Sequence, residues 1–319
     1  MPSTIAPFLH TSLLLFLPLL FYALAIIFPS SSIRSSSSSV DISSSAYDWN
    51  RDELPKCKKL LIRKEWHRWF IHLFDISLRD NCGYRGPTPY WDWSRDHADL
   101  FHSPIFEDSP EYGLGGTGDC DSTDCIVTTG AFAAGNFELA WPVQHSLRRN
   151  LTLLTGWFEH EQPQNRTLGP ETVRNWTEQT KGDFFRFQHA MEALHDHVHN
   201  FVGGDLSGDC PKVMPEEACH GLADKFTPND PLFWLHHGQL DRLWSRWQRH
   251  SSSNFHAFSG MPMSPHNMND TRYDVDAHAD FQMPFDTQGV SVSPRRVFDT
   301  ESWPLCYRYM EEEEQKVEL

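Results

Sequence analysis

LHDHVHNFVGG (194–204) and NDPLFWLHHGQLDRLWSRWQ (229–248) are the two segments of the sequence that decide the fold. His195 and His199 are separated by one helical turn, so on a helix they project from the same face. The second segment carries an adjacent pair, His236–His237, within a second helical pattern. Three imidazoles from two facing helices can surround one metal ion, and copper is the natural candidate.

This combination of HxxxH, a Gly-Gly turn, DPLFWLHH and DRLW resembles the copper-B half of the tyrosinase, catechol oxidase and hemocyanin group. The resemblance implies that copper B is bound by both histidines of HxxxH and by the second histidine of the pair: His195, His199 and His237. His197 lies about 200° round the helix from His195 and is expected outside the ligand set. We expect His236 to point away from the ion, as a packing residue or a neighbour of the ligands.

The segments WHRWF (66–70) and CGYRGPTPYWDWS (82–94) resemble the end of the copper-A region of the same family. By this resemblance His67 is the third copper-A ligand. Asp75 stands where family members usually carry Glu, which keeps the charge on a shorter side chain.

Two further copper-A histidines are expected upstream of WHR, but residues 46–65 contain no histidine. His10 lies in the apolar leader, and His72 lies about 140° round the helix from His67. The remaining candidates have no informative spacing: His97, His102, His145 and His160. The sequence therefore predicts a complete copper-B site and an incomplete copper-A site.

Two explanations of the incomplete copper-A site remain open: an exon lost from the predicted gene, or a divergent natural product. The segment CKKLLIRKEW (57–66) resembles the opening of the family's domain, which normally lies well upstream of WHR. Here the two motifs meet near Trp66. This join favours the lost exon.

The resemblance covers about residues 54–309, ending at the element Tyr307-x-Tyr309. It implies a mainly α fold, an antiparallel helical bundle around a type 3 copper centre, with long loops and minor β structure. It also implies two copper ions, and oxidation of a small phenolic substrate, an o-diphenol, to an o-quinone by O2. Imidazole suits both copper oxidation states. The alternatives are a reversible oxygen carrier and a non-catalytic protein that binds one metal ion, such as zinc, at the copper-B histidines.

Two acidic residues near the copper-B ligands are catalytic candidates. Many tyrosinases have Asn where this chain has Asp196. In those proteins the Asn helps a Glu to hold a water that deprotonates monophenols. The resemblance makes Glu192 the candidate for that Glu. The Asp favours diphenol oxidation with little or no monophenol hydroxylation. Asp241 either orients a ligand helix or imidazole, or is a surface carboxylate paired with Arg246. Phe233 packs either beside a ligand ring or in the core.

The net charge of -16 argues against a nucleic-acid partner. We expect a signal peptide or signal anchor, a Ser-rich linker, the copper-binding domain and an acidic tail, in that order: 1–29, 30–53, 54–310 and 311–319. We therefore expect the protein to be secreted. It would contact a membrane only if the leader is an uncleaved anchor. Four glycosylation sequons support the secretory route, and they begin at Asn150, Asn165, Asn175 and Asn269.

Seven cysteines fit the same compartment. Cys120/Cys125 and Cys210/Cys219 are close enough in sequence to be disulfide partners, and the odd count leaves a free thiol or an external partner.

Helical spacing is expected over Leu60–Leu78 and over Thr180–Phe201, with Thr180 or Asp183 as the second helix's N-cap and Gly203-Gly204 as its end. Asn229-Asp230-Pro231 is expected to start the next helix. Phe281–Tyr309 is expected to be extended.

Overall fold

The computed structural model describes residues 65–153, 167–219, 222, 225–258, 279–280, 282–283 and 291–309. Its α-helices are α2 (Glu65–Cys82), α3 (Trp93–Asp96), α5 (Pro170–Glu178), α6 (Phe184–Val202), α7 (Gly204–Ser207), α8 (Glu216–Cys219), α9 (Leu232–His250) and α10 (Ser252–Phe255). Short 3-10 segments cover Leu100–His102, Pro104–Phe106, Thr227–Asn229 and Pro294–Val297. The strands β1 (Glu138–Leu139) and β2 (His145–Ser146) pair antiparallel. The prediction of a mainly α fold with long loops and minor β structure is confirmed.

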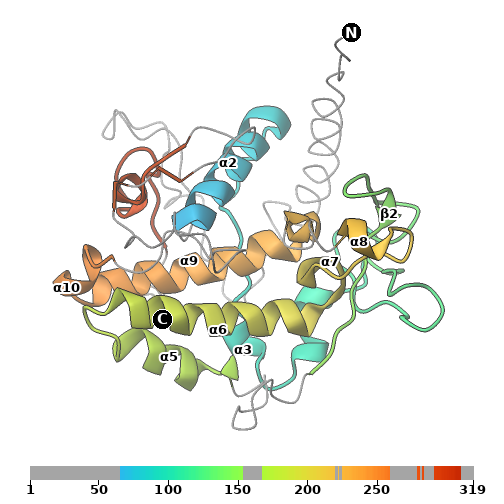
Figure 1. The fold of residues 1–319 in the computed structure, drawn as a ribbon, viewed down its shortest axis with the longest axis horizontal. Helices are drawn as coiled ribbons and strands as arrows, with labels where there is room; N and C mark the ends of the chain where they lie inside the picture. Colours follow the sequence, from blue (N-terminus) through green and yellow to red (C-terminus); the bar gives the residue numbers. More distant parts are fainter. Residues whose placement is uncertain are drawn as a thin grey trace, which may run out of the picture.

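The helices α6 and α9 lie side by side and run in opposite directions (Figure 1). In this view α2 crosses α9 on the side opposite α6, and α5 lies beside α6. Contacts join α2 to α9 and α6 to α9, so α9 is the element shared by both halves of the expected site.

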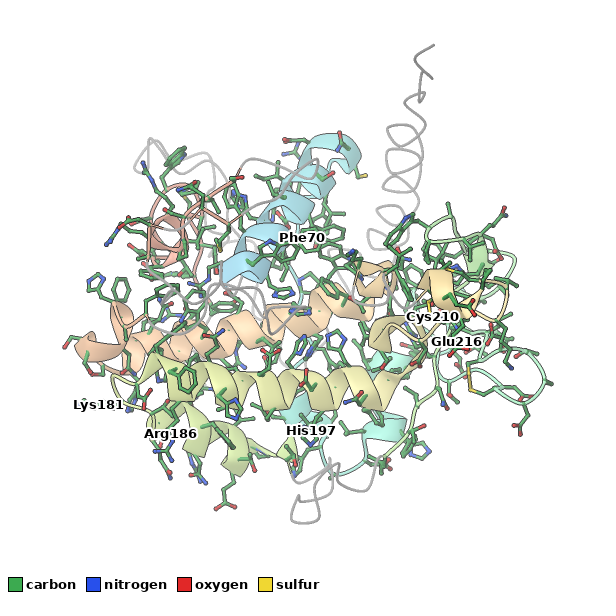
Figure 2. The ribbon with its side chains drawn as sticks, in the orientation of Figure 1. Phe70, Lys181, Arg186, His197, Cys210 and Glu216 are labelled. Carbon is green, nitrogen blue, oxygen red and sulfur yellow. A yellow bond between two sulfur atoms is a disulfide. The ribbon has the colours of Figure 1, made fainter. Side chains whose placement is uncertain are left out.

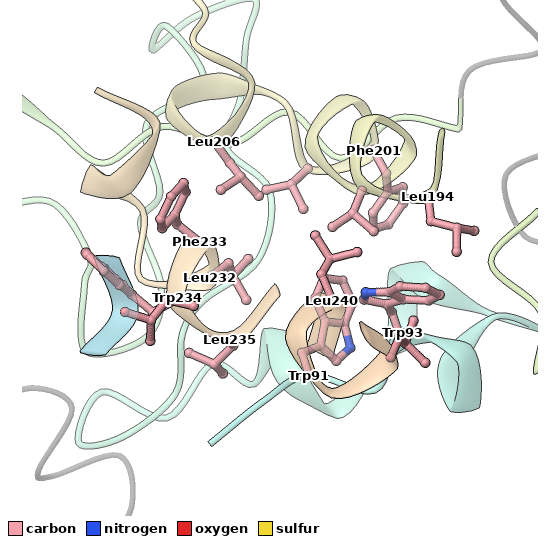
Figure 3. Close-up of a cluster of buried hydrophobic side chains, with 14 of the residues drawn as sticks. Trp91, Trp93, Leu194, Phe201, Leu206, Leu232, Phe233, Trp234, Leu235 and Leu240 are labelled. Carbon is pink, nitrogen blue, oxygen red and sulfur yellow. The ribbon is translucent and has the colours of Figure 1, made fainter. Parts of the chain in front are cut away.

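The helix α6 has one continuous apolar face. Its buried apolar residues recur every three or four positions, and each is at most 2% exposed: Phe187, Met191, Leu194, Val198 and Phe201. Figure 3 shows Leu194 and Phe201 gathered with Leu240 of α9 in one apolar cluster. His195 and His199 each follow a residue of this face by one position, which places them at its border.

Both ends of α6 have a local cause. Asp183 is the N-cap, and its carboxylate accepts a hydrogen bond from the backbone N–H of Arg186 at 3.0 Å. Gly203 ends the helix at φ +63, and an added Cβ would lie 2.7 Å from the carbonyl oxygen of Asn150. Of the two predicted N-caps, Asp183 is therefore the one used, and the predicted end at Gly203 is confirmed.

The helix α9 is buried along most of its length, and only Arg246, Arg249 and His250 are exposed. Its start is held by Asp230, whose carboxylate accepts from the backbone N–H of Leu232 at 2.8 Å. Arg149 donates two hydrogen bonds to the same carboxylate, at 2.7 and 2.8 Å, and both side chains are fully buried. The long loop before α5 is therefore tied to the turn that precedes the histidine pair. The predicted start of this helix at Asn229-Asp230-Pro231 is confirmed, since α9 begins at Leu232.

The two predicted disulfides, Cys120–Cys125 and Cys210–Cys219, are present. Cys210 lies beside α8 (Figure 2), in the connection between α6 and α9. Cys306 is disulfide-bonded as well, and Cys82 is a free thiol. The odd cysteine count is thus explained by a free thiol.

Replacing both Cys210 and Cys219 by serine is expected to lower the free energy of unfolding by about 2–3 kcal/mol, because the bond closes a short loop in the unfolded chain. Urea unfolding measures this, with Cys82→Ser as the control that breaks no bond. Equal midpoints for the double variant and the control would contradict the expectation.

The prediction of extended structure over Phe281–Tyr309 is wrong for most of the described part. Met283 and Val292 form one isolated antiparallel bridge, whereas Pro294–Val297 is a 3-10 turn. Further turns follow, such as the hydrogen bond from Leu305 N–H to the Ser302 carbonyl at 3.0 Å. The apolar residues of this segment pack with Trp69 of α2 instead of alternating across a sheet.

Several predictions fall partly or wholly outside the described residues: the leader, the Ser-rich linker, the acidic tail and the first residues of the predicted 60–78 helix. Within the described part, α2 runs four residues beyond that prediction, to Cys82. No helix in the described ranges is both long and apolar enough to cross a membrane.

Candidate metal centre

Four histidine side chains meet where α6 and α9 pack. One ring nitrogen each from His195, His199, His236 and His237 lies within 4.8 Å of the others. Ring centroids are 4.2 Å apart for His195 and His199, and 5.1 Å for His195 and His237. Ligand nitrogens around a four-coordinate ion at metal–nitrogen bonds of about 2.0–2.1 Å are about 3.4 Å apart. Small side-chain adjustments therefore suffice to enclose an ion.

Hydrogen bonds fix which nitrogen the α6 histidines present. His199 Nδ1 lies 2.5 Å from the carbonyl oxygen of Leu206, which only accepts, so Nδ1 carries the proton. His195 Nδ1 lies 2.8 Å from a carboxylate oxygen of Asp196 and donates in the same way. Both rings are left with an Nε2 lone pair, the arrangement by which surrounding groups orient metal-binding histidines.

Burial favours the uncharged form of two histidines of the cluster, His199 and His237. Nε2 of His199 and both ring nitrogens of His237 are shielded from solvent and have no hydrogen-bond partner among the described residues. Desolvation, together with the neighbouring His195, lowers the pKa of His199 to about 3. Burial also lowers the pKa of His237 well below its ordinary value. Neutral imidazoles with buried lone pairs are the donors that copper requires, so these residues fit a copper ion.

His67 of α2 lies beside the cluster but serves a different position. Its ring stacks on that of His237, with centroids 4.0 Å apart and an interplanar angle of 10°. An imidazole lone pair lies in the ring plane, so two nearly parallel rings at this spacing cannot point at one ion between them. They can serve two separate ions about 4 Å apart, the spacing of two-metal sites.

The expectation that His236 points away from the metal is wrong. Its ring centroid lies 5.5 Å from that of His195 and 5.2 Å from that of His199. One residue rotates a helix by about 100°, which still leaves both histidines of the pair on the half of α9 that faces α6. His236 is fully buried, as expected.

The other histidines that the sequence analysis weighed, where the structure describes them, have partners outside the cluster. His197 Nδ1 bonds to the carbonyl of Ala193 at 2.5 Å, and Figure 2 shows this residue on the side of α6 away from α9. His97 bonds to the carbonyl of Ser94, and His102 to Asp99. His145 bonds to Asp205 and to the carbonyl of Val143, while His72 packs on Trp69. His10 and His160 lie outside the described residues.

Asp241 is a buried anchor, so the alternative of a surface carboxylate paired with Arg246 is wrong. It accepts from Arg68 Nε at 2.6 Å, from Tyr307 at 2.5 Å and from Tyr309 at 2.6 Å. Burial, reinforced by the Asp241 carboxylate, raises the pKa of Tyr309 well above its ordinary value, so the phenol stays a donor.

This network joins three parts of the chain at the metal centre. Arg68 directly follows His67 on α2, Asp241 lies one turn after His237 on α9, and the tyrosines belong to the C-terminal segment. Sequence reasoning singled out Asp241 and the Tyr-x-Tyr element separately. It missed Arg68, which is 173 residues from Asp241.

The remaining predicted residues border the cluster. Phe233 lies 4.1 Å from the ring of His237 and 5.9 Å from that of His67, so it packs beside the histidine rings. Glu192 and Asp196 are exposed, and a Glu192 oxygen lies 4.0 Å from His195 Nδ1. Both carboxylates therefore lie on the solvent side of His195.

Residues 64–250 match the family model described as the common central domain of tyrosinase. The chain belongs to the tyrosinase family. This match contains α2, α6 and α9, and with them every histidine of the cluster.

Tyrosinase-family relatives occur among fungi. The chain is 30% identical over 253 residues to the tyrosinase-like protein phomQ2 of Diaporthe leptostromiformis, covering 76% of this chain and 57% of the relative. It is 29% identical over 252 residues to the tyrosinase ustQ of Aspergillus flavus, covering 76% and 62%. It thus spans less than two thirds of the length of these relatives. A solved polyphenol oxidase from Thermothelomyces thermophila is 23% identical, with a TM-score of 0.47 over 77% of this chain and 72% of that one.

Proposed function

We propose that this protein oxidises o-diphenols to o-quinones with O2 at a copper centre whose ligands are His195, His199 and His237, with His67 serving a second ion. The carrying observation is the cluster of four histidines, whose His199 and His237 present ring nitrogens shielded from solvent, in a chain of the tyrosinase family. Family membership supports a copper oxidase in general. The diphenol substrate and the number of ions are our proposal.

Copper, when bound, supplies the electron transfer from the phenol to O2. The protein's residues orient the ligands and hold the protons. Asp196 accepts the Nδ1 proton of His195, and the Leu206 carbonyl accepts that of His199, so both rings keep their Nε2 lone pairs towards the ion. Phe233 covers the rings with an apolar face, which excludes water from the ligand nitrogens.

Glu192 and Asp196 are proposed to act on the substrate's protons. A diphenol loses two protons as it becomes a quinone, and exposed carboxylates beside His195 are placed to accept them. A carboxylate only accepts hydrogen bonds, whereas an Asn amide also donates, and can hold a water between itself and Glu192. The carboxylate at Asp196 therefore favours diphenol over monophenol oxidation.

Asp196→Asn is expected to raise the ratio of monophenol to diphenol turnover by about 100-fold, the lower end of what a positioned base contributes. Initial rates with a monophenol and with its matching diphenol measure the ratio. Asp183→Asn, which keeps an N-cap on the same helix, is the control. An unchanged ratio would contradict the assigned role of Asp196.

We also propose a domain organisation and a secretory route for the whole chain. We take residues 54–310 as the copper-binding domain, behind a signal peptide or anchor (1–29) and a Ser-rich linker (30–53), and before an acidic tail (311–319). The proposed protein is secreted and glycosylated. Of its sequons, those at Asn150 and Asn175 begin at exposed residues. Its partners are a small phenol and O2.

A second candidate is a protein that binds one metal ion at the copper-B histidines without oxidising phenols. It is favoured by a specific observation: within the described ranges, no group of three metal-ligand residues includes His67. Sequencing the transcript across the codons for residues 57–66 tests the lost exon directly. An inserted segment with two histidines would favour the oxidase, and an uninterrupted join would favour the single-ion protein.

Catechol turnover by copper-loaded protein tests the proposed function. We expect formation of o-quinone, followed by its visible absorbance, with loss of the rate in His195→Gln. No turnover in protein that holds copper would contradict the oxidase and leave the single-ion candidate.

A further inference from the structure

We propose that His236 is a fourth ligand of the ion held by His195, His199 and His237, and that it closes this site to outside molecules while a single ion is bound. The inference rests on the proposed function only in requiring that the cluster bind a metal ion.

The two members of the histidine pair are equally placed towards α6. The ring centroid of His236 lies 5.5 Å from that of His195 and 5.2 Å from that of His199. The corresponding distances for His237 are 5.1 and 5.6 Å. Distance therefore gives no reason to include His237 in the ligand set and to leave His236 out.

Three of the four histidines also present ring nitrogens that are shielded from solvent. His236 and His237 are both fully buried, and their ring nitrogens are shielded from solvent. Nε2 of His199 is shielded in the same way, and that of His195 carries a lone pair because Nδ1 donates to Asp196. Water has no access to these shielded nitrogens, so the ligands of the ion come from the protein.

The stack of His67 on His237 distinguishes the two members of the pair. His237 faces both α2 and α6, since its ring lies 4.0 Å from His67 and 5.1 Å from His195. His236 lies against the α6 histidines. His237 is thus the member next to the second ion position, and His236 is the member that can leave without disturbing it.

Four ligands around an ion make a closed site, whereas a catalytic site keeps an open position. A chain that holds one ion through all four histidines is therefore protected from outside ligands. Oxidation of a phenol would require an open position on the ion, and hence His236 displaced from it.

The test uses the full chain loaded with one equivalent of Cu²⁺, compared with His236→Gln and with His197→Gln as the matched control. His197 lies on α6 between His195 and His199, two residues from each. Its Nδ1 bonds to the Ala193 carbonyl, outside the cluster. Nitrogen splittings in the electron paramagnetic resonance spectrum count the coordinated imidazoles, and azide titration reports an open position. Neither readout depends on catalysis.

We expect coupling to four nitrogens in the unaltered protein and in His197→Gln, and to one nitrogen fewer in His236→Gln. Azide is expected to bind the copper of His236→Gln at concentrations that leave the unaltered protein unchanged. Coupling to three nitrogens in the unaltered protein would overturn the inference, even if His236→Gln failed to fold. Such a protein that also oxidises catechol would leave the proposed function standing, whereas failure to bind copper would overturn both.

Discussion

His199→Gln is expected to weaken copper binding by at least about 100-fold, beyond the 10–100-fold that follows loss of a group that merely orients a ligand. His199 presents a buried Nε2 lone pair, and the Leu206 carbonyl holds its ring in place. Glutamine retains a donor for that carbonyl but removes the imidazole. Copper retained per chain after equilibrium dialysis against a competing chelator measures the change.

His197→Gln is the matched control for this prediction. It removes a histidine from the same helix, two residues away, whose Nδ1 is bonded to the Ala193 carbonyl. Equal copper affinity of the two variants would mean that the metal is bound elsewhere.

Asp241→Ala is expected to destabilise the protein by about 3–5 kcal/mol, because it leaves the guanidinium of Arg68 buried without its carboxylate. It also removes the acceptor for Tyr307 and Tyr309. Since the network joins the helices that carry His67 and His237, copper retention should fall by about 10–100-fold as well. The urea midpoint measures the first effect, and metal analysis of the folded protein measures the second.

Asp280→Asn provides the comparison for Asp241→Ala. Asp280 also pairs with an arginine, Arg295, but both side chains are more than half exposed, so little stability is expected from the pair. Midpoints lowered equally by the two substitutions would contradict the anchoring role of Asp241.

The sequence analysis was most accurate for the helices α6 and α9, whose apolar faces and ends depend on the spacing of nearby residues. The helix that carries His195 and His199 has an apolar period that is nearly ideal, and a capping residue and a glycine mark its ends. The start of α9 was predicted equally well, because Asp230 accepts from the first turn of the helix. The family resemblance then supplied the expected ligands, which periodicity alone does not identify.

The wrong predictions concern side chains and segments whose positions depend on contacts with distant parts of the chain. His236 was expected to point away from the ion although it directly precedes the ligand His237. The helix α9 is so enclosed that both rings meet α6. The partner of Asp241 was sought nearby, at Arg246, while the true partner is Arg68 on another helix. Extended structure was expected for residues 281–309, but in the described part of this range Pro294 and a series of turns prevent a strand.

The central claim, that buried histidines of α6 and α9 hold copper, is tested most directly by copper content per chain. Purified protein is reconstituted with excess copper, dialysed and analysed for metal, beside His199→Gln treated in the same way. We predict at least one copper per chain in the unaltered protein and a clearly lower content in the variant, which has lost one buried imidazole of the cluster. No retained copper in the unaltered protein, or equal retention in both, would contradict it.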